Sequence, residues 1–225
     1  MVINSQTKES EIPLVDVIKK HPEFYLGTKL KFQENRPLPF LMKVLSVNQA
    51  LSIQAHPDKK LAEKLFAQGT YPDDNHKPEV AVSLSDFEGL CGFRDPIEII
   101  NWTETLPEFA KVLGQDNIAA LKAAVDTKEK SKISAALKQA YAQLFQESCE
   151  KAKALRDAAI DAAIARKEET PEFGLIERLQ EKYPYDVGCL APFFLNYVRM
   201  GPGKCLFMAE NVPHALKKNL DEIFG

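Results

Sequence analysis

The sequence predicts an α+β protein in which a block of α-helices is inserted between stretches of antiparallel β structure. Short runs of β-forming residues, separated by turn residues, extend from Leu38 to about Phe93 and return after Tyr183. Between them, the stretch from Pro107 to Lys182 contains 16 alanines and balances 13 Lys and Arg against 13 Asp and Glu. That composition is typical of exposed helices rather than of sheet.

The N-terminal part of the chain predicts one helix followed by two strands. The helix extends from Glu11 to His21, with Ser10 as a candidate N-cap. Pro39 to Val47 is a short apolar run rich in β formers, and Leu51 to His56 alternates apolar with polar residues. We therefore expect two strands here, joined by a turn near Asn48.

A short helix and a further strand are predicted next. Pro57 and the charged residues after it introduce a helical stretch through Ala62 and Leu65. Residues 69–78 are dense in glycine, proline, aspartate and asparagine, which predicts a loop. Glu79 to Leu84 is rich in β formers and is the strand that we expect after this loop.

The helical block is followed by a return to strands. Apolar residues fall at helical spacing at two places in the block: Ile133, Leu137, Tyr141, Leu144 and Phe145, and more weakly Leu155, Ala159, Ala162 and Ala163. Cys189 to Val198 and Cys205 to Ala209 are predicted strands on either side of a Gly201-Pro-Gly203 turn. We expect the strands before and after the helices to belong to one sheet system, with the helices as a second lobe. The expected divisions of the chain are residues 1–37, an N-terminal helix and connection; 38–100, a β region; 101–184, the helical insertion; and 185–225, returning strands and a divergent tail.

Composition excludes several classes of protein. The chain has 225 residues, of which 45% are hydrophobic and 27% are charged, so it can bury a real core and is unlike a disordered chain. Its formal net charge is -3 and no basic stripe dominates the sequence, so we expect no nucleic-acid partner. No apolar run is long enough to span a membrane, and we expect no membrane partner. The four widely spaced cysteines, Cys91, Cys149, Cys189 and Cys205, predict reduced thiols in a cytoplasmic protein.

Residues that could carry chemistry are few. Strand alternation places Ser52, Gln54 and His56 on one face, where an amide and an imidazole two residues apart can converge on one ion. Glu79 begins a strand and could deliver a carboxylate to the same place, and His214 follows the end of a strand pair. Each residue taken alone also has an ordinary structural interpretation, such as the polar face of a half-buried sheet or a hydrogen-bonded loop histidine.

Two further side chains could each have either a functional role or an ordinary structural one. Lys43 is the one charge within the apolar run from Phe40 to Val47, and it suits either an edge strand whose lysine reaches water or a functional cation. His76 lies in the turn-rich loop, where a solvated histidine is the simpler interpretation.

Several motifs, in order along the chain, resemble those of the type I mannose-6-phosphate isomerases. They are Leu38-Pro-Phe-Leu-Met-Lys-Val-Leu-Ser46, Leu51-Ser-Ile-Gln-Ala-His-Pro-Asp-Lys59, Tyr71-Pro-Asp-Asp-Asn-His-Lys-Pro-Glu79, Leu90-Cys-Gly-Phe-Arg94, Phe193-Phe-Leu-Asn196, Gly201-Pro-Gly203 and Asn211-Val-Pro-His214. The resemblance runs from about Leu38 to His214, although the helical block matches in character more than in residues. It implies a cupin-like antiparallel β fold (a partial jelly roll) with an inserted α-helical domain.

The resemblance also implies a Zn²⁺ cofactor and its ligands. The family's metal-binding positions fall on Gln54, His56, Glu79 and His214. Two neutral imidazoles, one neutral amide and one carboxylate leave the Zn²⁺ site with a formal charge of about +1, which suits a Lewis acid that stabilises negative charge on a sugar oxygen. The implied substrate is a sugar phosphate, and Lys43, Ser52 and Lys77 are the implied substrate-binding residues.

The implied reaction interconverts mannose 6-phosphate and fructose 6-phosphate through an enediol and supplies mannose for GDP-mannose synthesis. Family members are considerably longer, so we expect a truncated or incomplete member that is weakly active or inactive. The family's catalytic arginine is expected beyond the end of this chain, and its role falls on no residue here. Residues 216–224 have helix-like spacing that could cap an open β structure.

Two other classes of function stay open at this point. One is a non-catalytic module that binds zinc and a sugar phosphate, and the other is an interaction protein built on the alanine-rich helices. The sequence offers no groove or heptad repeat in favour of the second. It does not determine the oligomeric state.

Overall fold

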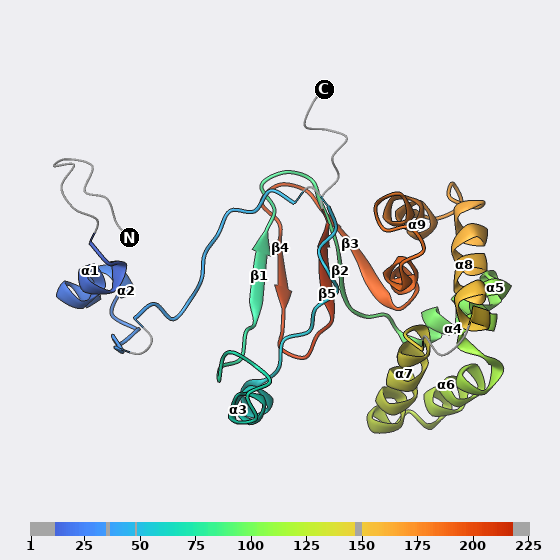
Figure 1. Ribbon diagram of the computed structural model, residues 1–225, viewed down its shortest axis with the longest axis horizontal. Helices are drawn as coiled ribbons and strands as arrows, with labels where there is room; N and C mark the ends of the chain where they lie inside the picture. Colours follow the sequence, from blue (N-terminus) through green and yellow to red (C-terminus); the bar gives the residue numbers. More distant parts are fainter. Residues whose placement is uncertain (1–11, 35–36, 48, 147–149, 218–225) are drawn as a thin grey trace. The chain divides into compact units, whose positions relative to one another are not determined.

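The computed structural model describes residues 12–34, 37–47, 49–146 and 150–217 of the chain. They fall into two units, Met1–Leu45 and Ser46–Gly225, which are described separately. In the first unit, the helices α1 (Leu14–Lys20) and α2 (Pro22–Leu26) follow one another (Figure 1). The predicted N-terminal helix is therefore confirmed over α1, but it begins at Leu14, after a proline, and the candidate N-cap Ser10 lies outside the described residues.

The strand predicted from Pro39 to Val47 is wrong: these residues adopt no regular secondary structure. Phe40, Leu41 and Met42 are all exposed in the first unit. A strand is held by hydrogen bonds to a neighbouring strand, and β-forming side chains cannot replace them. The composition of this segment therefore does not decide its conformation.

The second unit contains two small antiparallel sheets (Figure 1). In one, β1 (Glu79–Val82) pairs with β4 (Cys205–Met208). In the other, β2 (Phe87–Phe93) lies between β3 (Leu195–Met200) and β5 (His214–Lys217). Each sheet thus joins strands from before and after the helical block. That part of the expectation is confirmed, although the strands form two sheets rather than one.

A bulge interrupts the pairing of β2 with β3. The register shifts between Leu90 and Phe93, and Gly92 adopts a positive φ of 69° that glycine accepts without strain. The side-chain amide of Asn196 donates to the backbone carbonyls of Cys91, Gly92 and Phe93 at 3.0–3.2 Å. The Asn196 side chain therefore holds the backbone at the bulge.

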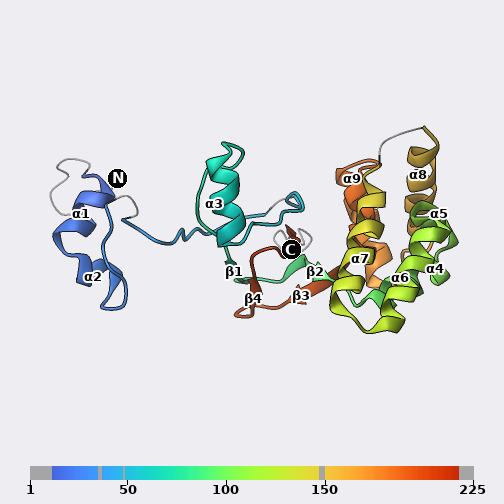
Figure 2. The same cartoon turned by 90° about the horizontal axis from the view of Figure 1, so that it is seen from below.

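Helices occupy most of the stretch from Pro107 to Lys182, as predicted, but a helix that the sequence did not predict, from Pro96 to Thr105, precedes it. The short helix α3 (Lys59–Ala67) is confirmed, and its N-cap Asp58 accepts a hydrogen bond from the Leu61 backbone N–H at 2.9 Å. The helical block contains α4 (Pro96–Thr105), α5 (Pro107–Leu113), α6 (Gln115–Thr127), α7 (Lys130–Leu144), α8 (Glu150–Ile164) and α9 (Pro171–Lys182). These six helices gather on the β3 side of the second unit, away from α3, in both views (Figures 1 and 2).

The strand predicted from Cys189 to Val198 is only half correct. Its first part is the 3₁₀ helix η1 (Val187–Phe193), and β3 begins at Leu195. The Asp186 side chain accepts from the Gly188 backbone N–H and caps η1, and Pro192 within it has no N–H to offer a sheet. The predicted helix over 216–224 is contradicted at Leu216 and Lys217, which lie in β5; its remainder lies outside the described residues.

The core of the second unit is built mainly by the helical block and η1. Phe109, Phe173 and Phe193 are fully buried, and the Phe193 ring contacts the other two, with centroids 4.5 and 6.0 Å away. Leu90 and Ala215 extend this core onto β2 and β5. The helical block thus packs against the three-stranded sheet through Leu90 and Ala215.

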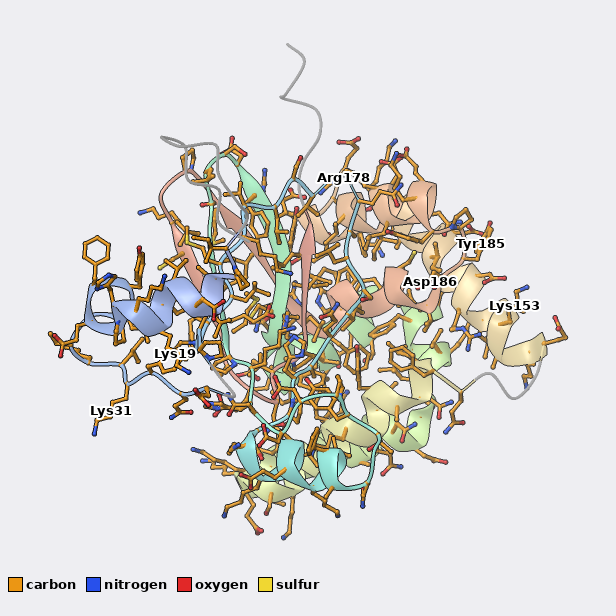
Figure 3. The ribbon with its side chains drawn as sticks, turned by 60° about the vertical axis from the view of Figure 1, so that its left-hand side comes forward. Lys19, Lys31, Lys153, Arg178, Tyr185 and Asp186 are labelled. Atoms are coloured by element: carbon orange, nitrogen blue, oxygen red, sulfur yellow. The ribbon has the colours of Figure 1, made fainter. Side chains whose placement is uncertain are left out.

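A buried carboxylate joins this sheet to α9. Glu88 on β2 is only 3% exposed and accepts hydrogen bonds from Arg178 at 2.9 Å and from the Tyr197 hydroxyl at 2.5 Å. Burial and the neighbouring Glu88 raise the pKa of Tyr197 to about 12, so its hydroxyl remains a donor. Figure 3 shows the Arg178 side chain on α9. No helix among the described residues is long and apolar enough to cross a membrane.

Candidate metal centre

The segment that carries Gln54 and His56 runs beside β5. The Gln54 backbone N–H donates to the His214 carbonyl at 2.9 Å, and the His214 N–H donates to the Gln54 carbonyl at 2.8 Å. The strand predicted from Leu51 to His56 is therefore present only as a single antiparallel bridge at Gln54. Residues directly opposite each other in such a pair place their side chains on the same face, and so does the residue two positions further along.

Three side chains from distant parts of the sequence meet on this face. His56, Glu79 and His214 each offer one ligand atom, and these atoms all lie within 4.8 Å of one another. His56 Nε2 is 3.4 Å from one Glu79 carboxylate oxygen, and His214 Nε2 is 3.7 Å from the other. The side chains of His56 and His214 are only 11% and 5% exposed, whereas Glu79 is 30% exposed. The group could hold a metal ion and is open to solvent on the Glu79 side.

A backbone contact orients the His214 ring. Its Nδ1 lies 2.9 Å from the Val212 carbonyl oxygen, which can only accept a hydrogen bond. Nδ1 is therefore assigned the proton, and Nε2 is left with a lone pair that faces Glu79. This tautomer is the one that a metal ligand bound through Nε2 requires.

The His56 ring has a nitrogen without a hydrogen bond. His56 Nε2 is buried and makes none among the described residues, which is unusual for a buried polar atom. Burial lowers the pKa of His56 below its ordinary value of 6.5; Lys77 and His214 act in the same direction, and Glu79 opposes them. A neutral imidazole with an unused nitrogen beside a carboxylate is suited to coordinate a cation.

The lowered pKa of His56 predicts a pH dependence for the metal-free protein. Above the unfolded-state pKa of about 6.5 the imidazole is neutral in both states, and below it the unfolded chain takes up the proton first. The free energy of unfolding should therefore be independent of His56 titration above that pH. It should fall as the pH drops from there toward the folded-state pKa of His56. Urea unfolding at a series of pH values with a chelator present measures this fall.

His56→Gln should make the fall smaller, because the variant has no imidazole to titrate at that position. The pH dependence of His21→Gln, in which an imidazole of the first unit is replaced in the same way, is measured for comparison. An unchanged pH dependence in His56→Gln would contradict the prediction.

The structure brings together three of the four predicted metal ligands and places the fourth beside them. Gln54 pairs with His214 through the backbone, and its side-chain amide donates to the Ser52 hydroxyl at 3.1 Å. Lys77 Nζ lies 3.4 Å from a Glu79 carboxylate oxygen. Lys43 is exposed in the first unit, and its role stays a prediction.

Two residues of this region were not singled out from the sequence. Asp58 and Asn211 pair with each other between the segment after His56 and the turn before His214. The N-cap pattern at Asp58 and the asparagine before Val-Pro-His214 are local signals for turns. Their contact joins residues 153 positions apart, which no local pattern reveals.

A separate cavity lies on the other side of the same segment. It has a volume of about 530 Å³ and is lined mainly by apolar side chains, among them Leu51, Ile53, Leu90 and Leu179. None of His56, Glu79 and His214 lines it. Ser52 also lines this cavity, beside Leu51 and Ile53, so the predicted alternation of this segment is only partly reflected in the structure.

Comparison with family models gives two matches, which together span most of the chain. The model described as phosphomannose isomerase type I, catalytic domain, matches residues 2–96. The model described as phosphomannose isomerase type I, helical insertion domain, matches residues 112–195. The second match coincides largely with the helical block of the structure.

Curated proteins and solved structures agree with these matches. Mannose-6-phosphate isomerase from Rattus norvegicus is 41% identical over 204 residues, which are 86% of this chain and 47% of the relative. The protein of that name from Saccharomyces cerevisiae is 36% identical over 231 residues, covering 94% of this chain and 52% of the relative. This chain thus spans about half the length of the curated relatives that it matches.

Solved structures that cover most of this chain have a similar fold. A crystal structure of mannose 6-phosphate isomerase in a zinc-bound form superimposes with a TM-score of 0.72 at 29% identity, covering 92% of this chain and 52% of that one. A mutant of phosphomannose isomerase from Salmonella typhimurium superimposes with a TM-score of 0.73 at 28% identity, covering 95% and 54%.

Proposed function

The chain belongs to the type I phosphomannose isomerase family, and from this premise we propose that it is a zinc-dependent isomerase. The proposed reaction interconverts mannose 6-phosphate and fructose 6-phosphate. The observation that carries this proposal is the convergence of His56, Glu79 and His214, whose ligand atoms lie within 4.8 Å of one another. The zinc-bound relative supports the choice of metal.

The residues present fit a zinc ion. Zn²⁺ accepts imidazole nitrogen and carboxylate oxygen, which are the donors that these three residues offer. His56 Nε2 is buried and has no hydrogen bond to any residue that the structure describes, and His214 Nε2 is left unprotonated by the contact of Nδ1 with the Val212 carbonyl. When bound, a zinc ion supplies a Lewis acid for the sugar oxygens on which negative charge develops.

Gln54 is the proposed fourth ligand. Its backbone pairing with His214 supports a side chain on the same face as the other three, and its amide oxygen is free of formal charge. Two neutral imidazoles, this amide and the Glu79 carboxylate would leave a site charge of about +1. A neutral ligand here preserves positive charge that a second carboxylate would cancel.

Binding of the substrate's phosphate is assigned to Lys43, Ser52 and Lys77. Lys77 supplies a cation beside the metal group, 3.4 Å from the Glu79 carboxylate, and Ser52 supplies a hydroxyl next to Gln54. A phosphate accepts hydrogen bonds from ammonium and hydroxyl groups, and the ammonium bonds are the stronger. Lys77 would hold the anion and also lie against Glu79, so its side chain would orient both.

The broader assignments belong to the same proposal. The fold is a cupin-like β structure with an inserted helical domain, divided as residues 1–37, 38–100, 101–184 and 185–225. The enzyme acts in the cytoplasm on a small sugar phosphate and supplies mannose for GDP-mannose synthesis. The free thiols of Cys91 and Cys205 support a reducing compartment.

A coupled isomerase assay on the zinc-loaded chain tests the proposal. We expect weak turnover of mannose 6-phosphate, because the role of the family's catalytic arginine falls on no residue of this chain. This turnover should be lost when a chelator removes the metal and restored when zinc is added back. Zinc analysis and calorimetric titration with mannose 6-phosphate are run on the same sample. Zinc and sugar binding without turnover would contradict the isomerase assignment, and the absence of zinc binding in folded protein would contradict the metal site.

A further inference from the structure

We propose that Asp58 and Asn211 form a positioning pair that sets the spacing between the His56 and His214 side chains. This inference rests on the proposed function, because it gives the pair a role in metal binding. Asp58 lies two residues after His56, and Asn211 lies three residues before His214. Any contact between them therefore links the two backbone segments that carry the imidazoles.

The contact is made from both sides. The Asn211 side-chain amide donates to Asp58 Oδ2 at 2.9 Å, and the Asp58 backbone N–H donates to Asn211 Oδ1 at 3.3 Å. The backbone N–H of Asn211 also donates to the His56 carbonyl oxygen at 2.7 Å. These bonds join His56 and the residue two positions after it to a single asparagine.

Local conformation on the Asn211 side passes this constraint on to His214. Asn211 has a positive φ of 63°, a conformation that asparagine tolerates better than most residues. The residue after it, Val212, donates its N–H to the Ala209 carbonyl at 3.3 Å and presents its own carbonyl to His214 Nδ1 at 2.9 Å. The turn that Asn211 holds thus supplies the acceptor that fixes the His214 ring.

Asp58 is held just as firmly on the other side. Its Oδ1 accepts from the Leu61 N–H at 2.9 Å as the N-cap of α3, while Oδ2 receives the Asn211 amide. The two carboxylate oxygens therefore have separate partners, one in the helix and one in the turn. Asp58 is therefore held by the end of α3 and in turn holds Asn211. Through Asn211 it also sets the position of His214 relative to His56.

Such a pair acts by preorganisation. With the pair present, the metal-free protein already holds the two imidazoles at one distance, and less conformational freedom is lost when a metal binds. Loss of an outer contact that orients a ligand typically weakens metal binding by about 10–100-fold. We expect about a tenfold rise in the zinc dissociation constant when the pair is broken.

Two variants break the pair while sparing the local structure. Asp58→Ser keeps a side-chain oxygen for the α3 cap but has no second oxygen for Asn211. Asn211→Gly keeps the positive φ and the N–H to His56 but removes the side chain. Asp95→Ser is the matched control, because Asp95 caps α4 through the Ile97 N–H in the helical block.

Zinc affinity is measured by competition with a chromophoric chelator. We expect both single variants to bind zinc about tenfold more weakly. The double variant should bind no more weakly than Asn211→Gly, because Asn211→Gly already removes both hydrogen bonds of the pair. Asp95→Ser should bind zinc like the wild type. Wild-type affinity in both single variants, or an equal loss in Asp95→Ser, would overturn the inference.

Amide hydrogen exchange in the metal-free protein gives a second measure that needs no zinc. The N–H groups of Asn211 and His214 donate across the two segments and should exchange faster in Asp58→Ser than in the wild type or Asp95→Ser. Unchanged exchange at both groups would overturn the positioning role, whatever the metal does. A wild-type protein that binds no zinc would contradict the proposed function instead.

Discussion

Replacing His214 by alanine is expected to weaken zinc binding by more than about a hundredfold, beyond the range for outer contacts, and to abolish isomerase turnover. The variant removes the Nε2 that faces Glu79 and leaves His56 and Glu79 as the remaining pair of the group. Zinc content after dialysis, chelator competition and the coupled assay measure the loss. The backbone bridge between Gln54 and His214 does not need the imidazole, so the fold should remain.

His76→Ala is the matched control for this experiment. His76 lies three residues before Glu79, where β1 begins, but its side chain is 42% exposed. Its Nδ1 faces Glu210 at 3.7 Å rather than the three converging side chains. The control should keep the wild-type zinc affinity. Near-normal zinc binding by His214→Ala, with circular dichroism unchanged in both variants, would reject His214 as a ligand.

Replacing Phe193 by alanine is expected to lower the free energy of unfolding by about 3–5 kcal/mol. The ring is fully buried and contacts Trp102, Phe109 and Phe173, with centroids 4.5–6.0 Å away. Removing it forfeits the burial of the ring and leaves a cavity that close-packed aromatic neighbours fill poorly. Urea denaturation followed by tryptophan fluorescence measures the change, because the chain's single tryptophan, Trp102, lies against this ring.

Phe207→Ala is the matched control for the core. Phe207 lies on β4 and is 63% exposed, so the same chemical change removes little buried surface. We expect its unfolding free energy to stay within about 0.5 kcal/mol of the wild type. Equal losses in the two variants would mean that η1 does not pack into the core as described.

Local patterns predicted the helices well. Alanine-rich composition and the spacing of Leu137 and Leu144 predicted α7, and both residues are buried there. The short helix after Pro57 was predicted from that proline and the charged residues that follow it. These signals work because the hydrogen bonds of a helix close within a few residues of sequence.

Strands were predicted less well, for a physical reason. Glu79–Val82 and Cys205–Met208 proved to be strands, but Pro39 to Val47 did not, although it has the same β-forming composition. In the segment from Cys189 to Val198, the cap at Asp186 and the proline at 192 gave η1 instead of the first half of a strand. A strand depends on a partner elsewhere in the chain, and the identity of that partner is not written in the strand itself.

The amino-acid sequence alone predicted most of the helical block, an alternation with Gln54 and His56 on one face, and, through ordered motifs, the family resemblance. Only the tertiary structure decided that Glu79 and His214 approach His56, and that Asp58 bonds to Asn211. The reason is the distance along the sequence between the residues that interact. Alternation follows from the geometry of consecutive peptide units, whereas convergence of residues more than a hundred positions apart depends on antiparallel pairing on either side of the helical block.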